Sequence, residues 1–140
     1  MLVLEGIAME CERSIHDLIE SGSIAELGDM LHRQPRSIEE KDDLDNYPIH
    51  TACWEKQTQA LGLLIESGAD VNARGGRGDT PLHLAVTEGN AISLPLVSEL
   101  IANGANPLIR NDIGHTAIDW AKIQMDDCLA EVLNLMKNSE

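Results

Sequence analysis

The sequence predicts an all-α fold, a solenoid in which short helix-turn-helix units are stacked along one axis. Residues 80–85, Thr-Pro-Leu-His-Leu-Ala, carry strong helix start signals, because Thr80 can cap the first turn and Pro81 suits the first helical position. A related segment begins at Tyr47, 33 residues earlier, and another at Thr116, 36 residues later. Two turns of helix are unstable alone, so units that recur at this spacing must bury their apolar faces against one another.

Two longer segments further along the repeats also end alike. Residues 63–72 read Leu-Leu-Ile-Glu-Ser-Gly-Ala-Asp-Val-Asn, and residues 100–106 read Leu-Ile-Ala-Asn-Gly-Ala-Asn. A weaker copy of the first pattern lies at residues 13–18. The Thr-Pro-Leu-His-x-Ala pattern, its period near 33 residues and these endings resemble the ankyrin repeat. The resemblance covers roughly residues 13–137 and implies stacked helix pairs with a β-turn finger projecting at each junction.

The repeat period divides the 140 residues into five segments of a single domain. We expect an N-terminal cap at 1–12, a degenerate repeat at 13–46, a repeat at 47–79, a repeat with three inserted residues at 80–115 and a C-terminal capping repeat at 116–140.

The first two repeats should differ at their helix starts. Repeat one is expected to hold helices near 14–21 and 24–33, ended by Pro35 and followed by a solvated, charged loop over 36–45. In repeat two Tyr47 replaces the capping threonine, which removes one cap and should loosen that helix start by about 1 kcal/mol.

Repeats three and four also depart from the pattern. Fifteen residues separate Gly89 from Gly104, so three extra residues are expected within 91–95, where Pro95 fits a helix start or a loop. This insertion is either a tolerated surface bulge or part of a binding surface. In repeat four the second helix, near 127–137, is expected to close the stack.

Composition places the chain among soluble cytoplasmic proteins. It has no Phe, one Tyr and two Trp, so the core must come from aliphatic side chains. Cys11, Cys53 and Cys128 form no Cys-x-x-Cys pair and are expected to be free thiols in a reducing compartment. The N-terminus has no basic segment typical of a signal peptide, and no apolar run is long enough to span a bilayer.

The formal net charge of −14 restricts the classes of partner. Such a field repels nucleic acid and anionic membranes and favours basic proteins. The alternative explanation is that the negative charge only keeps the protein soluble, and this requires no partner.

Candidate catalytic and metal sites are better explained as scaffold. His16, His50 and His83 occupy one repeat position, and the resemblance implies that they hydrogen-bond within the repeats and orient the fingers. The acidic residues of 42–46 suggest a calcium-binding loop. Pro48, however, stands where an EF-hand loop needs glycine, so a charged finger is the better interpretation. The Gly-Gly-Arg-Gly run at 75–78 lacks the lysine and the preceding strand of a phosphate loop. No catalytic residue, cofactor or metal is predicted.

The resemblance places the binding surface on the concave side, made of finger tips and the exposed ends of the first helices. The expected protein-binding residues are Asp43, Leu44, Asn46, Trp54, Glu55, Arg77, Asp79, Thr87, Glu88, Asp112, Ile113, His115 and Gln124. Five of them form an acidic strip with Arg77 as its one base, namely Asp43, Glu55, Asp79, Glu88 and Asp112. Trp54 is either an exposed anchor for a partner or half-buried against its own finger.

We therefore predict a non-enzymatic module that binds a protein partner through an acidic concave face, as an inhibitor or immunity-type protein for a basic target. A nuclease toxin or another nucleic-acid-binding protein would be such a target. The alternative is a structural adaptor or assembly spacer that uses its end caps or convex surface. The unbound chain is expected to be a monomer.

Overall fold

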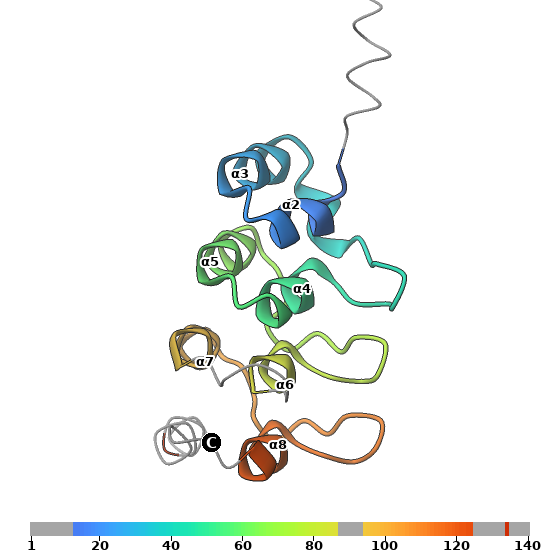
Figure 1. Ribbon diagram of the computed structural model, residues 1–140, viewed down its shortest axis with the longest axis vertical. Coiled ribbons are helices and arrows are strands. Elements are labelled where there is room, and N and C mark those ends of the chain that lie inside the picture. Colours follow the sequence, from blue (N-terminus) through green and yellow to red (C-terminus); the bar gives the residue numbers. More distant parts are fainter. Residues whose placement is uncertain (1–12, 87–93, 125–133, 135–140) are drawn as a thin grey trace, which may run out of the picture.

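A computed structural model describes residues 13–86, 94–124 and 134. This part of the chain holds seven α-helices and one 3-10 helix, and no strand. Figure 1 shows two columns of helices: α2, α4, α6 and α8 form one, and α3, α5 and α7 form the other. Loops project from the first column, on the side away from the second. The predicted all-α solenoid of stacked helix pairs is confirmed.

The first helix of repeat one is closed at both ends by its own sequence. Helix α2 spans Ile15–Ser21, and the Ser14 hydroxyl accepts from the Asp17 N–H at 3.1 Å while the Asp17 carboxylate accepts from the Ser14 N–H at 3.2 Å. The helix ends at Gly22, whose φ of 74° is left-handed.

The second helix of repeat one is followed by more structure than the sequence indicates. Helix α3 spans Ile24–Arg33, as predicted, but the 3-10 helix η1 then covers Pro35–Glu39. Ser37 is 2% exposed, and Ile38 packs on the core. The prediction of a wholly solvated loop over 36–45 is therefore wrong in its first part, because the apolar Ile38 side chain anchors this turn against the core.

In repeat two, helix α4 spans Pro48–Trp54 and α5 spans Thr58–Glu66. The Tyr47 side chain makes no capping hydrogen bond, as expected, but its own N–H donates to His50 Nδ1 at 3.2 Å. The Tyr47 ring stacks on the His50 ring, with 6.0 Å between centroids, and the Lys41 ammonium lies 5.2 Å from the Tyr47 centroid. These contacts offset part of the missing cap.

In repeat three, helix α6 spans Pro81–Ala85 and α7 spans Leu94–Ala102. The α6 start is capped as predicted, with Thr80 Oγ1 accepting from the His83 N–H at 3.4 Å. Pro95 lies in the first turn of α7, which agrees with its expected place at a helix start. Most of the predicted insertion, 91–93, lies outside the described residues.

In repeat four, helix α8 spans Ala117–Gln124. Thr116 Oγ1 accepts from the Asp119 N–H at 3.1 Å, and the Asp119 carboxylate accepts from the Thr116 N–H at 2.9 Å. The hydrogen bond from the Thr116 backbone lowers the pKa of the Asp119 carboxyl. The predicted N-terminal cap at 1–12 and the second helix near 127–137 lie outside the described residues.

The core between the two columns is aliphatic. Among the described residues, nine large aliphatic side chains are essentially inaccessible to water, namely Ile15, Ile19, Leu27, Ile49, Leu61, Leu64, Leu82, Leu96 and Leu100. Cys53 is a buried free thiol, and burial raises its pKa to about 12, so it stays protonated and unreactive.

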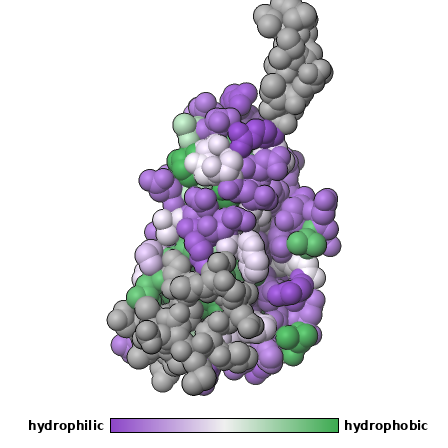
Figure 2. Space-filling model, in the orientation of Figure 1, coloured by the Kyte–Doolittle hydropathy of each residue, from purple (hydrophilic) through white to green (hydrophobic). Residues whose placement is uncertain are grey.

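None of the described helices has the length and apolar character that crossing a bilayer requires. The coloured part of the face seen in Figure 2 is largely hydrophilic, with apolar side chains at the finger side and at the opposite side.

Candidate functional site

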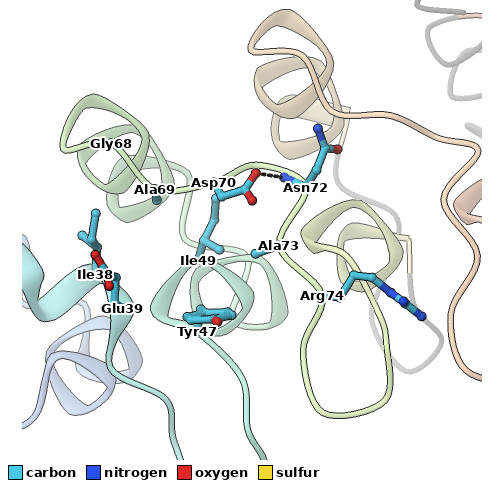
Figure 3. A pocket seen from close by; sticks show the side chains of 10 residues that line it. All are labelled: Ile38, Glu39, Tyr47, Ile49, Gly68, Ala69, Asp70, Asn72, Ala73 and Arg74. Atoms are coloured by element: carbon cyan, nitrogen blue, oxygen red, sulfur yellow. Dashed lines mark hydrogen bonds between the residues drawn. The ribbon is translucent and has the colours of Figure 1, made fainter.

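One hollow of about 500 Å³ lies between η1, the start of α4 and the loop after α5 (Figure 3). Its walls include Ile38, Tyr47 and Ile49, and its charged groups are of both signs, with Glu39 and Asp70 against Arg74. Asp70 Oδ1 is already occupied, because it accepts from the Asn72 N–H at 2.8 Å. The electrostatic potential of this hollow is therefore mixed, and it does not favour a partner of either charge.

Three fingers on the other side of the first helices share one hydrogen-bond pattern. In the turns 42–46, 75–79 and 111–115, the N–H of the first residue donates to the carbonyl of the fifth at 2.9 Å. The fourth residue has positive φ in each turn, 64° at Asp45, 74° at Gly78 and 89° at Gly114. Asp42 Oδ1 accepts from the N–H groups of Leu44 and Asn46, so this side chain stabilises the turn of the first finger. The predicted β-turn fingers are confirmed.

The repeated histidines attach the fingers to the helices. The Nε2 atoms of His16, His50 and His83 donate to backbone carbonyls of the finger segments, at distances of 2.8–3.0 Å. The Nδ1 atoms of His50 and His83 accept from the backbone N–H groups of Tyr47 and Thr80, and the Nδ1 of His16 lies 2.7 Å from the Thr51 hydroxyl. The scaffold role that the resemblance implied for these histidines is confirmed.

This arrangement makes stability depend on pH. Burial lowers the pKa of His50 and of His83 below the ordinary value of 6.5. Because the unfolded histidines bind protons more readily, the contribution of the neutral rings is complete above about pH 6.5 and is lost as the pH falls through the lower folded pKa. We expect the urea midpoint to be constant from pH 8 to 7 and to decrease below pH 6.5. In that range each histidine lowers the free energy of unfolding by up to about 1.4 kcal/mol for each unit by which the pH falls. A midpoint that rises steadily on acidification to pH 5.5 would contradict this.

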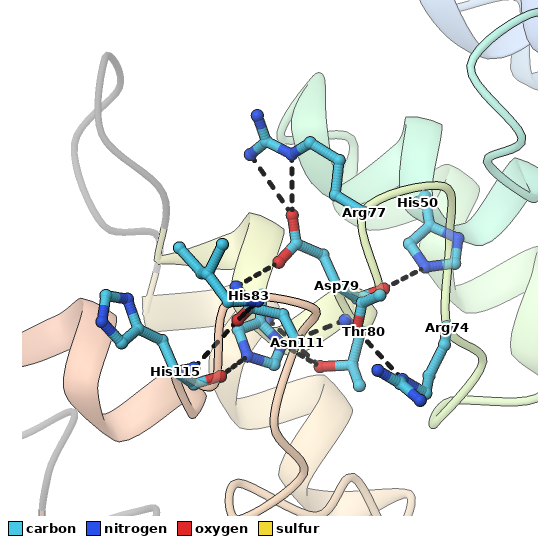
Figure 4. A network of polar contacts seen from close by, with 10 residues as sticks. His50, Arg74, Arg77, Asp79, Thr80, His83, Asn111 and His115 are labelled. Atoms are coloured by element: carbon cyan, nitrogen blue, oxygen red, sulfur yellow. Dashed lines mark hydrogen bonds and ion pairs between the residues drawn. The ribbon is translucent and has the colours of Figure 1, made fainter.

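Asp79 joins the second finger to the third (Figure 4). Its Oδ2 accepts from Arg77 Nε and Nη2 at 3.4 and 3.3 Å, and its Oδ1 accepts from Asn111 Nδ2 at 2.9 Å. Asp79 is only 4% exposed. The expectation that Asp79 belongs to an exposed acidic strip is therefore wrong, because its carboxylate is buried and occupied by these donors.

The fingers and first helices enclose a groove of about 570 Å³. Its lining residues come from the first two fingers and from α2, α4 and α6, and they are Glu20, Asp42, Asp43, Leu44, Asp45, Asn46, His50, Thr51, Trp54, Glu55, Gly76, Arg77, Asp79 and Leu84. We call this the acidic groove, because it holds six carboxylates and one guanidinium. The structure thus brings together seven of the predicted binding residues.

Two large apolar side chains of the groove are open to solvent. Trp54, the last residue of α4, is 46% exposed and lines the groove. Leu44 at the first finger is 73% exposed. The groove thus combines exposed apolar side chains with acidic ones.

The other predicted residues do not line this groove. Asp112 and Ile113 are exposed on the third finger, where Asp112 pairs with Arg74 at 3.4 Å. The His115 ring packs edge-on against Trp120, 5.4 Å between centroids. Gln124 is the last residue of α8, and Thr87 and Glu88 lie outside the described residues.

Sequence reasoning missed several lining residues that the repeat register could have indicated. Glu20 occupies in repeat one the position that Trp54 occupies in repeat two, and Leu84 stands where Thr51 stands one repeat earlier. Since equivalent residues face the same side of a solenoid, extending the register from Trp54 would have found Glu20.

Within the described ranges, no three His, Cys, Asp or Glu side chains gather in a way that could hold a metal ion. Among the acids named above, Asp42 accepts from backbone N–H groups of its own finger, and Asp79 accepts from the side chains of Arg77 and Asn111.

Comparison with known proteins agrees with the fold. A family described as ankyrin repeats, in three copies, matches residues 15–111 and 49–138. The rat mitochondrial disaggregase is 35% identical over 97 residues, covering 66% of this chain and 13% of that protein. The intracellular phospholipase A2 of Caenorhabditis elegans is 33% identical over 98 residues, covering 69% of this chain and 9% of that protein. The target of rapamycin complex 2 subunit AVO2 of Saccharomyces cerevisiae is 36% identical over 76 residues, 54% of this chain and 18% of that subunit.

The chain spans less than a fifth of the length of these three relatives, and the likeness to those with enzyme names rests on the repeats. Ankyrin repeats are typically non-catalytic modules that mediate protein–protein interaction. The stacked helix pairs, the three fingers and the family match over most of the sequence lead to one conclusion: this chain belongs to the ankyrin-repeat family.

Proposed function

We propose that this protein binds a basic segment of a partner protein in the acidic groove and does so without catalysis. The observation that carries the proposal is the lining of the groove, six carboxylates and one guanidinium around the exposed Trp54 ring. The one guanidinium, on Arg77, is already paired with the buried Asp79, so it leaves the exposed acids unneutralised.

A basic partner is favoured by the charges that remain. Glu20, Asp43 and Glu55 line the groove as exposed acids. Opposite charge on a partner would speed encounter and fix its orientation, whereas like charge would be rejected. The net charge of −14 extends this preference beyond the groove.

The role we propose is that of an inhibitor or immunity-type protein for a basic target, acting in the cytoplasm and monomeric when unbound. Covering the basic surface of a nucleic-acid-binding protein would block its access to phosphates. The relative AVO2 is named as a subunit of a complex. Ankyrin repeats generally mediate protein–protein interaction, which is consistent with this role. A spacer that uses the end caps or convex surface would keep its partner when the groove is altered.

Charge reversal in the groove tests this proposal. We would capture partners from the host lysate with the wild type, identify them by mass spectrometry and measure their affinity for an Asp43→Lys, Glu55→Lys double variant. The expected result is a loss of about tenfold or more, because two attractive charges become repulsive. Affinity of the wild type should also fall as salt is raised.

The matched control is Asp29→Lys, Glu66→Lys. These exposed acids lie on α3 and α5, in the other column of helices, and their reversal changes the net charge equally. We expect a change of less than about threefold, from the long-range field only. Equal losses in both double variants, or a salt-independent affinity, would refute the groove as the binding site.

A further inference from the structure

We propose that the group recognised in the acidic groove is an arginine of the partner, whose guanidinium lies on the Trp54 ring while its N–H groups reach the rim carboxylates. This inference rests on the proposed function and deepens it, because it names which cation the groove selects.

The Trp54 ring is the part of the groove that would receive a planar cation. It is 46% exposed, and indole is the aromatic ring that attracts cations most strongly. Within the described part of the chain, the cation placed over an aromatic ring is Lys41, and it lies over Tyr47. The ring of Trp54 is thus left to a cation from outside.

The rim supplies acceptors that are not used by the fold. Glu20, Asp43, Asp45 and Glu55 line the groove and form no ion pair with the described residues. They differ in this from Asp79, whose carboxylate is buried and occupied. Exposed carboxylates beside an aromatic ring match the two binding modes of a guanidinium, stacking by its plane and donation by its edge.

The apolar neighbours distinguish arginine from lysine. Leu44 and Leu84 line the same groove as Trp54. A guanidinium is weakly hydrated and loses little when it enters such surroundings, whereas an ammonium is a strongly hydrated point charge. A wholly apolar partner is disfavoured too, because it would cover the rim carboxylates without pairing them.

Two peptides of equal length and charge test the proposal, hexa-arginine and hexa-lysine with blocked termini. A Trp120→Phe background leaves Trp54 as the only tryptophan, so fluorescence reports on the groove. Calorimetry on the wild type gives an independent affinity. We expect hexa-arginine to bind about fivefold more tightly than hexa-lysine and to change the Trp54 emission. In a Trp54→Leu variant, which keeps an apolar group and the charges, we expect the preference to fall below about twofold.

The outcomes separate the two proposals. Equal affinity of the two peptides in the wild type, or a preference that persists in Trp54→Leu, would overturn arginine selection while leaving a basic partner in place. Binding that the Asp43→Lys, Glu55→Lys variant keeps in full would place the peptides outside the groove and overturn it as well. If neither peptide binds at low salt, the basic target itself is refuted, and the arginine proposal with it.

Discussion

Replacing His50 by alanine is expected to lower the free energy of unfolding by about 3 kcal/mol. His50 is fully buried, its Nδ1 accepts from the Tyr47 N–H, and its Nε2 donates to the carbonyls of Ala73 and Asp79 at 3.0 and 2.9 Å. Alanine would leave these backbone groups without their partner and a cavity where the ring was. Each of these effects costs about 1–3 kcal/mol, and they act at the same place.

Urea unfolding at pH 7.5, followed by circular dichroism, measures this loss. His32→Ala is the control, because His32 is exposed on the last turn of α3 and a substitution there should change stability by less than about 0.5 kcal/mol. The His50→Ala variant should also show a weaker decrease in stability below pH 6.5, since one of the two histidines whose pKa is lowered by burial is gone. A loss below about 1 kcal/mol would mean that His50 does not hold the second finger.

Replacing Gly76 by alanine is expected to destabilise the protein by about 2 kcal/mol. The second finger approaches the first so closely that a Cβ on Gly76 would overlap the Leu44 carbonyl oxygen and lie 3.2 Å from Asp45 Cβ. The atom in the way belongs to the backbone, so it cannot rotate aside and the fingers must separate. Because Leu44 and Gly76 both line the acidic groove, the same variant should bind the partner more weakly.

Gly62→Ala gives a control of opposite sign. Gly62 lies inside helix α5, and a Cβ there would meet no atom within 4 Å. Alanine should therefore stabilise the helix by about 0.5–1 kcal/mol, since it restricts the unfolded chain and favours the helix. Equal and small effects of the two substitutions, measured by urea unfolding, would show that the fingers are not in tight contact.

Most helix boundaries were predictable from the sequence because their signals are local. Ser14 and Thr80 cap helices with their own hydroxyls, and Gly22 ends one in the left-handed conformation. Such contacts join residues a few positions apart, so a single repeat contains them. Ile38 shows the limit of this reasoning, because its burial in η1 depends on contact with the core and not on its neighbours in sequence.

The candidate site was predictable in its location and not in its composition. The repeat register indicated that the residues around 43–46, 54–55 and 76–79 share one face, and the acidic groove contains them. The burial of Asp79 was not foreseen, because it is decided by Asn111 on the next finger, 32 residues away. The exposure of Trp54 was left open as well, because packing between segments decides it and the residue type does not.

By itself, the sequence determined the repeat unit, most helix starts and stops, the aliphatic core and the sign of the net charge. These follow from periodicity and composition, which need no knowledge of distant contacts. Only the tertiary structure decided which carboxylates are exposed and which are buried and hydrogen-bonded. It also decided that Glu20 lines the groove and that Gly75 and Gly76 allow two fingers to lie in contact. The physical reason is that desolvation, hydrogen bonding and steric overlap between fingers act between residues about one repeat apart, and stacking alone brings them together.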